Sequence, residues 1–230
     1  MKVSSPAPVI AVDGPSGTGK GTLCMRLARH LGWHLLDSGA LYRVLAALAE
    51  RSGLSLGDGP GLARLAARLD IAFREAHGGI TVHCNSEDLS KVVRTESCGA
   101  AASKVAALPE VRTALFAAQK GFRRVPGLVA DGRDMGTVVF PDARLKVFLT
   151  ASPEARAERR HNQLKQQGIN VRLEILHQDI GERDVRDSAR TVSPLRPAPD
   201  AVVVDTSCLG IEAVFEHVLA LVQDRDLGRG

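Results

Sequence analysis

A glycine-rich segment near the N-terminus carries the strongest chemical pattern in this sequence: Gly14-Pro15-Ser16-Gly17-Thr18-Gly19-Lys20-Gly21-Thr22. Its spacing is that of a phosphate-binding loop, in which glycines let backbone N–H groups wrap phosphate oxygens and a following helix adds its positive N-terminal field. Lys20 would then reach the β- and γ-phosphates of a nucleotide. A merely flexible glycine turn is the alternative, and the position of the segment between a strand pattern and a helix pattern argues against it.

The residue after the loop lysine departs from the common form of this motif. Gly21 has no hydroxyl and the hydroxyl moves to Thr22, so the usual Ser/Thr ligand of magnesium is displaced. We therefore expect ATP as the phosphoryl donor, with Mg²⁺ held by ATP oxygens and water, and we predict no protein residue as a metal ligand. A Lys-Gly-Thr ending resembles that of adenylate kinases and related nucleoside monophosphate kinases more than that of switch GTPases.

Three further segments narrow the resemblance. They are His34–Arg43 (HLLDSGALYR), Ala130–Thr137 (ADGRDMGT) and Glu182–Arg190 (ERDVRDSAR). Together they resemble the bacterial cytidylate kinases, and the resemblance covers roughly residues 7 to 222. It implies ATP-dependent phosphorylation of CMP to CDP, with dCMP as a second acceptor and with no nucleic acid or membrane as partner.

The resemblance also implies which residues hold the acceptor nucleotide. Arg133 would bind the phosphate of CMP, while Ser103, Arg112 and Asp134 would meet the edge of cytosine. The chemistry is consistent, because a carboxylate accepts from the exocyclic amine of cytosine while guanidinium and hydroxyl groups donate to its ring nitrogen and carbonyl. By residue type alone, Ser103 and Arg112 are also typical of solvent-facing helix positions, and the aspartates of Asp131-Gly132-Arg133-Asp134 are typical of a capped turn.

Further candidates for acceptor binding lie on two helix patterns. Ser38 and Arg43 flank the start of the second helix, where Arg43 could bind an acceptor phosphate through two N–H groups. Arg183, Asp187 and Arg190 fall at i, i+4 and i+7 and are predicted to share one helical face, where they could hold the acceptor sugar and brace the phosphate. A surface arginine and a solvated ion-pair ladder are the respective alternatives.

An arginine-rich stretch from Arg156 to Arg190 predicts a mobile lid on helical stems. Arg156 and Arg160 lie one helical turn apart, so closure of the lid could bring guanidinium groups onto the transferring phosphoryl group. We therefore predict Lys20, Arg133, Arg156 and Arg160 as catalytic residues, without deciding which lid arginine makes the contact. The lid is placed at about residues 156–172, with its loop tip at Gln166-Gln167-Gly168.

Five short apolar runs, bounded by Gly, Pro or Asp, predict the strands that position these residues. They are Val9–Val12, His34–Leu36, Leu128–Ala130, Leu145–Leu149 and Ala201–Val204, with helical patterns between them. This order predicts an α/β fold with a doubly wound five-stranded parallel sheet, helices on both faces, and a nucleotide crevice at the carboxyl ends of the strands. A last helix is expected over Ile211 to Val222.

The stretch from about residue 52 to 105 breaks this order. Leu62, Leu65 and Leu69 predict a short helix. Apolar residues then alternate with polar ones on both sides of His77-Gly78-Gly79, which predicts an antiparallel hairpin. We interpret the stretch as a small antiparallel-sheet, acceptor-binding insertion in a single P-loop kinase domain of residues 1–230.

Composition limits the remaining possibilities. A chain of 230 residues with 44% hydrophobic residues can build one sizeable core. Aromatic residues make up only 3%, and no polybasic run accompanies the formal charge of +4, which disfavours nucleic-acid binding. The four cysteines lack metal-ligand spacing and are expected to be buried and reduced. No leader or membrane-length segment is recognised, so we expect a cytoplasmic protein, with a monomer as the default.

Two other functions stay open on the motifs alone. A phosphate-binding loop does not choose the acceptor, so UMP, AMP or shikimate could take the place of CMP. The chain could also be a non-catalytic switch module that uses bound nucleotide to order its loops.

Overall fold

Five parallel strands form the central sheet of the computed structural model, which describes residues 6–76, 79–166 and 168–227. The strands are β1 (Val9–Asp13), β2 (His34–Asp37), β6 (Leu128–Gly132), β7 (Leu145–Thr150) and β8 (Val202–Asp205). Their spatial order is β2-β6-β1-β7-β8, and the pairings between them are parallel. The predicted sheet is confirmed, and β1 lies at its centre.

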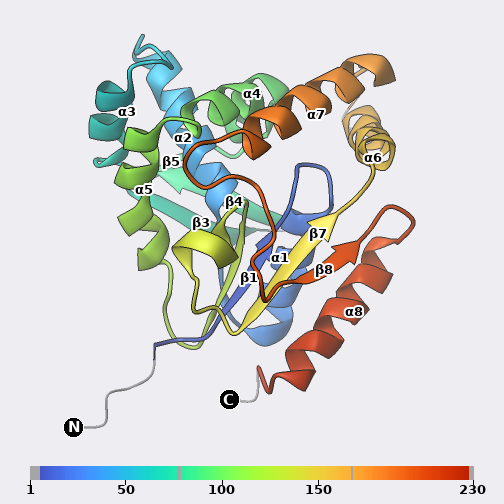
Figure 1. The fold of residues 1–230 in the computed structure, drawn as a ribbon. Helices are drawn as coiled ribbons and strands as arrows, with labels where there is room; N and C mark the ends of the chain where they lie inside the picture. The colour runs from blue at the N-terminus through green and yellow to red at the C-terminus, as the bar shows by residue number, and fades with distance from the viewer. Residues whose placement is uncertain (1–5, 77–78, 167, 228–230) are drawn as a thin grey trace, which may run out of the picture.

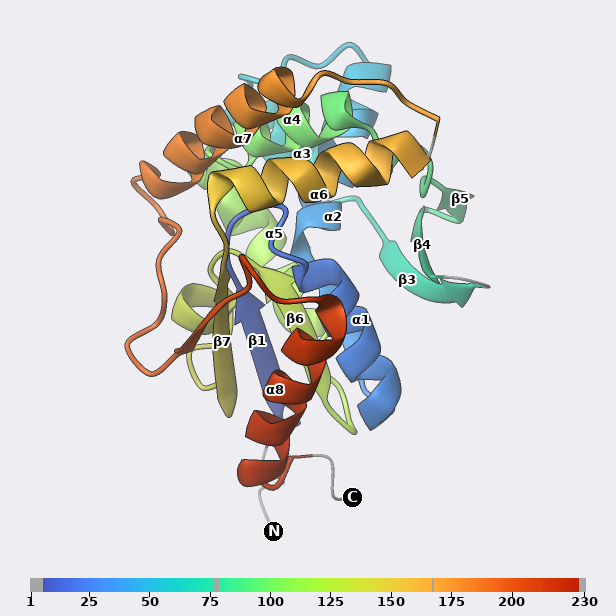
Figure 2. The same cartoon turned by 90° about the vertical axis from the view of Figure 1, so that its right-hand side faces the viewer.

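The two faces of the sheet follow from alternation along β1, whose residues are all buried. Val9 and Ala11 pack in one hydrophobic cluster with residues of α2 (Ser38–Arg51) and α5 (Pro109–Gly121). Ile10 and Val12 pack in a second cluster with residues of α1 (Lys20–Leu31) and α8 (Ile211–Asp224). Helices therefore cover both faces, as predicted, and Figures 1 and 2 show the two layers. None of the helices in the described ranges is long and apolar enough to span a bilayer.

A second, three-stranded antiparallel sheet packs against α2. It consists of β3 (Ile71–Ala76), β4 (Gly79–Cys84) and β5 (Glu87–Asp88), and it is followed by η1 (Val92–Arg94) and α4 (Glu96–Val105). Figure 2 shows this sheet standing apart from the central one. The predicted hairpin is confirmed, although residues 77 and 78 of its expected turn lie outside the described residues.

The short helix before this sheet, α3 (Gly59–Ala66), ends earlier than predicted. The prediction of a helix that reaches Leu69 is wrong. The backbone N–H of Leu69 donates to the carbonyl oxygen of Ala66 at 3.2 Å, which turns the chain toward β3. The side chain of Leu69 packs against the clusters around α2, so tertiary packing rather than helical periodicity explains its apolar character.

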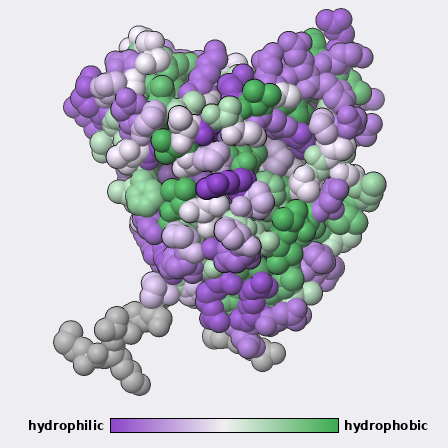
Figure 3. All heavy atoms as spheres, in the orientation of Figure 1, coloured by the Kyte–Doolittle hydropathy of each residue, from purple (hydrophilic) through white to green (hydrophobic). Residues whose placement is uncertain are grey.

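Two helices, α6 (Pro153–Gln166) and α7 (Leu173–Ser188), form the arginine-rich segment above the carboxyl ends of the strands (Figure 1). Hydrophilic side chains gather over them at the upper right of Figure 3. The helices pack on each other through a cluster of their own, made of Ala157, Leu164, Leu176 and Ile180.

The ends of these two helices correct two predictions. Gln166 belongs to α6 rather than to a loop tip, and Gln167 lies outside the described residues. Because α7 ends at Ser188, Arg190 does not share a helical face with Arg183 and Asp187. It lies in the segment that follows the helix.

The four cysteines are free of disulfides. Cys24, Cys84 and Cys98 are buried, as predicted for small apolar side chains. Cys208 is exposed between β8 and α8, so the prediction of burial is wrong there.

Candidate active site

The glycine-rich loop leaves the carboxyl end of β1 and leads into α1. Gly14 starts the loop with φ at 145°, and a Cβ there would lie 2.1 Å from the carbonyl oxygen of Leu149 on β7. Only glycine therefore lets the loop begin this close to the sheet. Gly19 is the N-cap of α1 and no acidic residue lies in the first turn, which leaves this helix N-terminus suited to an anion.

Lys20, the first residue of α1, is buried and folds back over the loop. Its Nζ donates to the carbonyl oxygen of Pro15 at 2.6 Å. Burial first, and then the guanidinium of Arg133, lower the pKa of Lys20 to about 7. Burial also raises the pKa of the Asp131 carboxyl to about 7, although Lys20 opposes that shift. Phosphate beside these groups would favour the charged form of Lys20.

The strand that carries Asp131 is longer than predicted. β6 ends at Gly132, so Asp131 lies within it, paired in register with Val12 of β1. Arg133 and Asp134 then leave the carboxyl end of the strand. Because β1 and β6 are parallel neighbours, the loop after β1 and the side chains after β6 meet at the same edge of the sheet.

Arg112 on α5 and Asp134 form a buried ion pair at this edge, with side chains that are 8% and 6% exposed. Nη1 of Arg112 also donates to the carbonyl oxygen of Ala106 at 3.2 Å. Ser103 on α4 is buried and lines the same small cavity. A carboxylate, a guanidinium and a hydroxyl group thus converge at one place, which suits the polar edge of a flat ligand.

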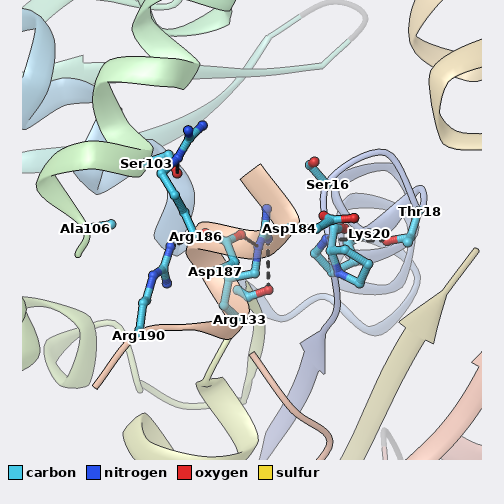
Figure 4. A network of polar contacts seen from close by, with 12 residues as sticks. Ser16, Thr18, Lys20, Ser103, Ala106, Arg133, Asp184, Arg186, Asp187 and Arg190 are labelled. Atoms are coloured by element: carbon cyan, nitrogen blue, oxygen red, sulfur yellow. Dashed lines mark hydrogen bonds and ion pairs between the residues drawn. The ribbon is translucent and has the colours of Figure 1, made fainter. Parts of the chain in front are cut away.

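Asp187 on α7 is 1% exposed and joins two arginines. Its Oδ2 accepts from Nε of Arg133 at 2.9 Å, and its Oδ1 accepts from Nη2 of Arg190. Figure 4 shows Arg133 and Asp187 between Ser103 and Arg190 on one side and Lys20 on the other. Arg190 therefore reaches the cluster although it lies beyond α7.

Several guanidinium groups crowd around this centre. Burial, with Arg133 and Arg43, lowers the pKa of Arg183 to about 9. Burial and Arg43 also lower the pKa of Arg160. Asp187 offsets only part of this positive charge, so the remaining guanidinium groups suit a phosphate group.

The acceptor residues predicted from the sequence, all except Arg43, line one small cavity of about 50 Å³. They are Ser38, Ser103, Arg112, Arg133, Asp134, Arg183, Asp187 and Arg190. Among the described residues, the Nε atoms of Arg112, Arg183 and Arg190 are buried without a hydrogen-bond partner. Such N–H groups are costly to leave unpaired, which indicates that the cavity receives a ligand rich in acceptors. Arg43 is elsewhere engaged, with Nη1 donating to the carbonyl oxygen of Val93 at 2.7 Å.

The family model described as Cytidylate kinase matches residues 10–224. The chain belongs to the cytidylate kinase family.

Curated relatives in the family match this chain along nearly its whole length. The Cytidylate kinase of Stutzerimonas stutzeri (strain A1501) is 55% identical, over 96% of this chain and 98% of its own length. That of Shewanella frigidimarina (strain NCIMB 400) is 56% identical, over 96% and 97%. That of Pseudomonas putida is 54% identical, over 98% and 100%.

The two arginines predicted for a lid in this member of the cytidylate kinase family both have protein partners. Nη1 and Nη2 of Arg156 donate to the two carboxylate oxygens of Asp184 at 2.9 and 2.5 Å, and Nη1 also donates to the carbonyl oxygen of Ser16 at 3.3 Å. Arg160 forms an ion pair with Glu96 at the start of α4. Arg156 therefore braces the glycine-rich loop, whereas Arg160 links α6 to α4.

Sequence reasoning missed three residues that support the site. Asp184 and Arg186 lie on α7, where helical spacing from Arg183 and Asp187 could have found them. Nε of Arg186 donates to Oγ of Ser103 at 3.4 Å. Asp13, the last residue of β1, gives no local signal, because its partners are backbone N–H groups far along the chain.

Proposed function

We propose that this protein transfers the terminal phosphoryl group of ATP to CMP, forming ADP and CDP, and accepts dCMP as a second substrate. Membership of the cytidylate kinase family supports the reaction. The observation that carries it is the buried Arg112–Asp134 pair, which lines the same cavity as Arg133 at the sheet edge that also holds Lys20.

Cytosine fits the groups around this pair better than uracil does. Asp134 would accept from the exocyclic amine, while Arg112 and the hydroxyl of Ser103 would donate to the ring nitrogen and the carbonyl. Uracil places a carbonyl opposite the carboxylate and an N–H opposite a donor, and buried mismatches of this kind are strongly disfavoured. These base contacts do not read the 2′-hydroxyl, which supports dCMP as an acceptor.

The acceptor phosphate would lie among the crowded guanidinium groups. Arg133 and Arg183 would neutralise it, and Arg43 would turn from the carbonyl oxygen of Val93 to join them. Asp187 and Arg190 would hold the sugar and fix Arg133. A phosphate monoester with a second pKa of about 6 is already largely ionised at neutral pH, so one of its oxygens can attack the γ-phosphorus without a strong general base. The bond from the γ-phosphorus to the β–γ bridging oxygen breaks, and ADP leaves.

The donor side would be formed by the loop N–H groups and Lys20. Their positive charge would stabilise the charge that develops on the transferring phosphoryl oxygens. Asp131 would face the water shell of Mg²⁺ rather than bind the ion directly, because Mg²⁺ bound to phosphates keeps several of its waters. Its Oδ2 lies 3.6 Å from where a Cβ on Gly21 would stand, directly at the loop. Bound there, Mg²⁺ would neutralise charge on the ATP phosphates.

The lid, at about residues 156–172, and the acceptor-binding insertion, at about residues 52–105, would close over the two nucleotides. Arg156 would keep the loop in shape through Ser16. Arg160 would move from Glu96 toward the transferring phosphoryl group. Closure would also exclude water that could otherwise accept the phosphoryl group.

The same proposal includes a cytoplasmic monomer whose partners are small nucleotides rather than nucleic acid. The buried, unpaired thiols of Cys24, Cys84 and Cys98 are compatible with a reducing compartment.

A coupled assay of ADP formation tests the reaction. ATP and Mg²⁺ are combined with CMP, dCMP, UMP, AMP or shikimate for the wild type, Lys20→Ala, Asp134→Ala and the surface control Asp142→Ala. We expect CMP and dCMP to dominate, Lys20→Ala to abolish turnover, and Asp134→Ala alone to erode the preference for cytosine. Faster turnover with another acceptor would reassign the substrate, and nucleotide binding without acceptor-dependent turnover would favour a switch module.

A further inference from the structure

Asp13 holds the backbone that carries Asp134. It is the last residue of β1, immediately before the glycine-rich loop, and it is 5% exposed. Its Oδ1 accepts from the backbone N–H of Met135 at 2.8 Å, and its Oδ2 accepts from the backbone N–H of Gly136 at 2.8 Å. Both carboxylate oxygens are therefore committed to the two peptide groups that directly follow Asp134.

Those two peptide groups begin a short π-helical turn, η2 (Met135–Val139), whose N-cap is Asp134. The first N–H groups of a helical turn have no partner within the turn, and Asp134 itself makes no capping bond here. Asp13 thus acts as a cap supplied from another strand, and its negative charge suits the N-terminal end of the turn. The side chain of Asp134 remains free to pair with Arg112.

The fit around this contact is close. A Cβ on Gly136 would lie 3.1 Å from Cδ of Lys146 and 3.4 Å from Oδ2 of Asp13, so a larger residue there would press on Lys146 and touch the carboxylate. Burial raises the pKa of Asp13 to about 6, so keeping this carboxylate ionised in the core is costly. A charged group retained at such a place needs a role that a neutral side chain would not fill.

We propose that Asp13 is a positioning residue for base selectivity, which fixes Asp134 at the height and angle that cytosine requires and ties it to the start of the phosphate-binding loop. This inference rests on the proposed function. With both N–H groups held, the turn after β6 has one position relative to β1, and the distance from Asp134 to the loop is set. Without these two hydrogen bonds, Asp134 can shift together with Arg112, and their donor and acceptor groups no longer match the cytosine edge.

Asp13→Asn is the sharpest test, because it preserves shape while replacing one acceptor oxygen with an NH₂ group that faces a backbone N–H. We expect the kcat/KM for CMP relative to UMP to fall by about tenfold, with the KM for ATP changed less than about twofold. Gly136→Ala perturbs the same contact from the other side, without touching the loop, and should reproduce the loss of selectivity. Asp200→Asn, which removes the negative charge that pairs with Lys146 on the exposed side, should leave the selectivity unchanged.

The variants test the role of Asp13, and the wild-type protein tests the proposed function. If Asp13→Asn and Gly136→Ala lower the melting temperature or kcat but leave the CMP to UMP ratio as in the wild type, Asp13 is merely structural and the proposal fails. If Asp13→Asn does not fold, the ratio for Gly136→Ala decides. The wild-type acceptor panel reports the proposed function independently: a protein that prefers UMP or AMP refutes that function whatever the variants do.

Discussion

Arg160 on α6 forms an ion pair with Glu96 at the N-terminus of α4, which joins the two helices directly. The two side chains are 23% and 46% exposed. At that exposure the pair contributes less than about 1 kcal/mol to stability. The ion pair matters because it holds the guanidinium of Arg160 beside the arginine cluster that we assign to the acceptor phosphate.

We predict that Arg160→Ala lowers kcat by about a hundredfold, whereas Glu96→Gln changes it by less than about threefold. Arg160 would stabilise the negative charge of the transition state. Glu96 would only pair with Arg160 before the nucleotides bind. Steady-state kinetics with saturating CMP measure both, and Arg172→Ala, an exposed arginine at the N-cap of α7, is the matched control. Equal losses for Arg160→Ala and Arg172→Ala would remove Arg160 from catalysis.

Arg186 is predicted to keep uracil out through Ser103. Its Nε–H occupies an acceptor site on Oγ of Ser103, which directs the hydroxyl proton toward the base. In Arg186→Ala the hydroxyl is free to accept from N3–H of uracil, so we expect the kcat/KM for UMP relative to CMP to rise about threefold to tenfold.

The Arg186 prediction is checked with competing CMP and UMP in one reaction. Ser103→Ala provides the comparison, because removal of the hydroxyl should make a further Arg186→Ala change silent. Additive effects in the double variant would show that the two residues act separately.

ATP binding is predicted to take up protons above neutral pH. With its pKa lowered to about 7, Lys20 is largely neutral at pH 8, and a polyphosphate beside it raises that pKa. The proton uptake should therefore be small at pH 6, where Lys20 is already charged, and should grow toward pH 8. Burial raises the pKa of Asp131 to about 7, and binding of ATP without Mg²⁺ raises it further. Asp131 therefore also takes up a proton when ATP alone binds.

Calorimetric titration with ATP and no Mg²⁺, in buffers of different ionisation enthalpy, measures this uptake. Lys20→Met should bind ATP weakly and lose most of the buffer dependence. A wild-type binding enthalpy that does not vary with buffer at pH 8 would contradict the prediction.

Two glycine substitutions separate steric strain from backbone strain. Gly14→Ala puts a Cβ 2.1 Å from the carbonyl oxygen of Leu149, whereas Gly32→Ala meets no atom within 4 Å and has only a φ of 64° to accommodate. We expect unfolding in urea to show a loss of more than about 3 kcal/mol for the first and about 1 kcal/mol for the second. Similar losses for the two would mean that the loop can move away from β7.

The local patterns of the sequence were enough for the sheet, the main helices and the hairpin, because each depends on periodicity within a few residues. The convergence of Arg112 with Asp134 came only from family resemblance, since no spacing rule joins α5 to the turn after β6. Helical spacing placed Arg156 and Arg160 on one face but could not name Asp184 or Glu96 as partners, because those depend on how α6 packs. The role of Asp13 could not be predicted from the sequence, because its partners are backbone N–H groups, which every residue type except proline provides.

The separate apolar cluster of α6 and α7 divides the molecule mechanically. Ala157, Leu164, Leu176 and Ile180 pack with one another rather than with either large cluster of the central sheet. When the proposed lid opens, this pair of helices would therefore move as one body and leave the apolar clusters on both faces of the sheet intact. Its opening free energy is then smaller than that of global unfolding, and its amide hydrogens should exchange with solvent ahead of those of β1 and β6.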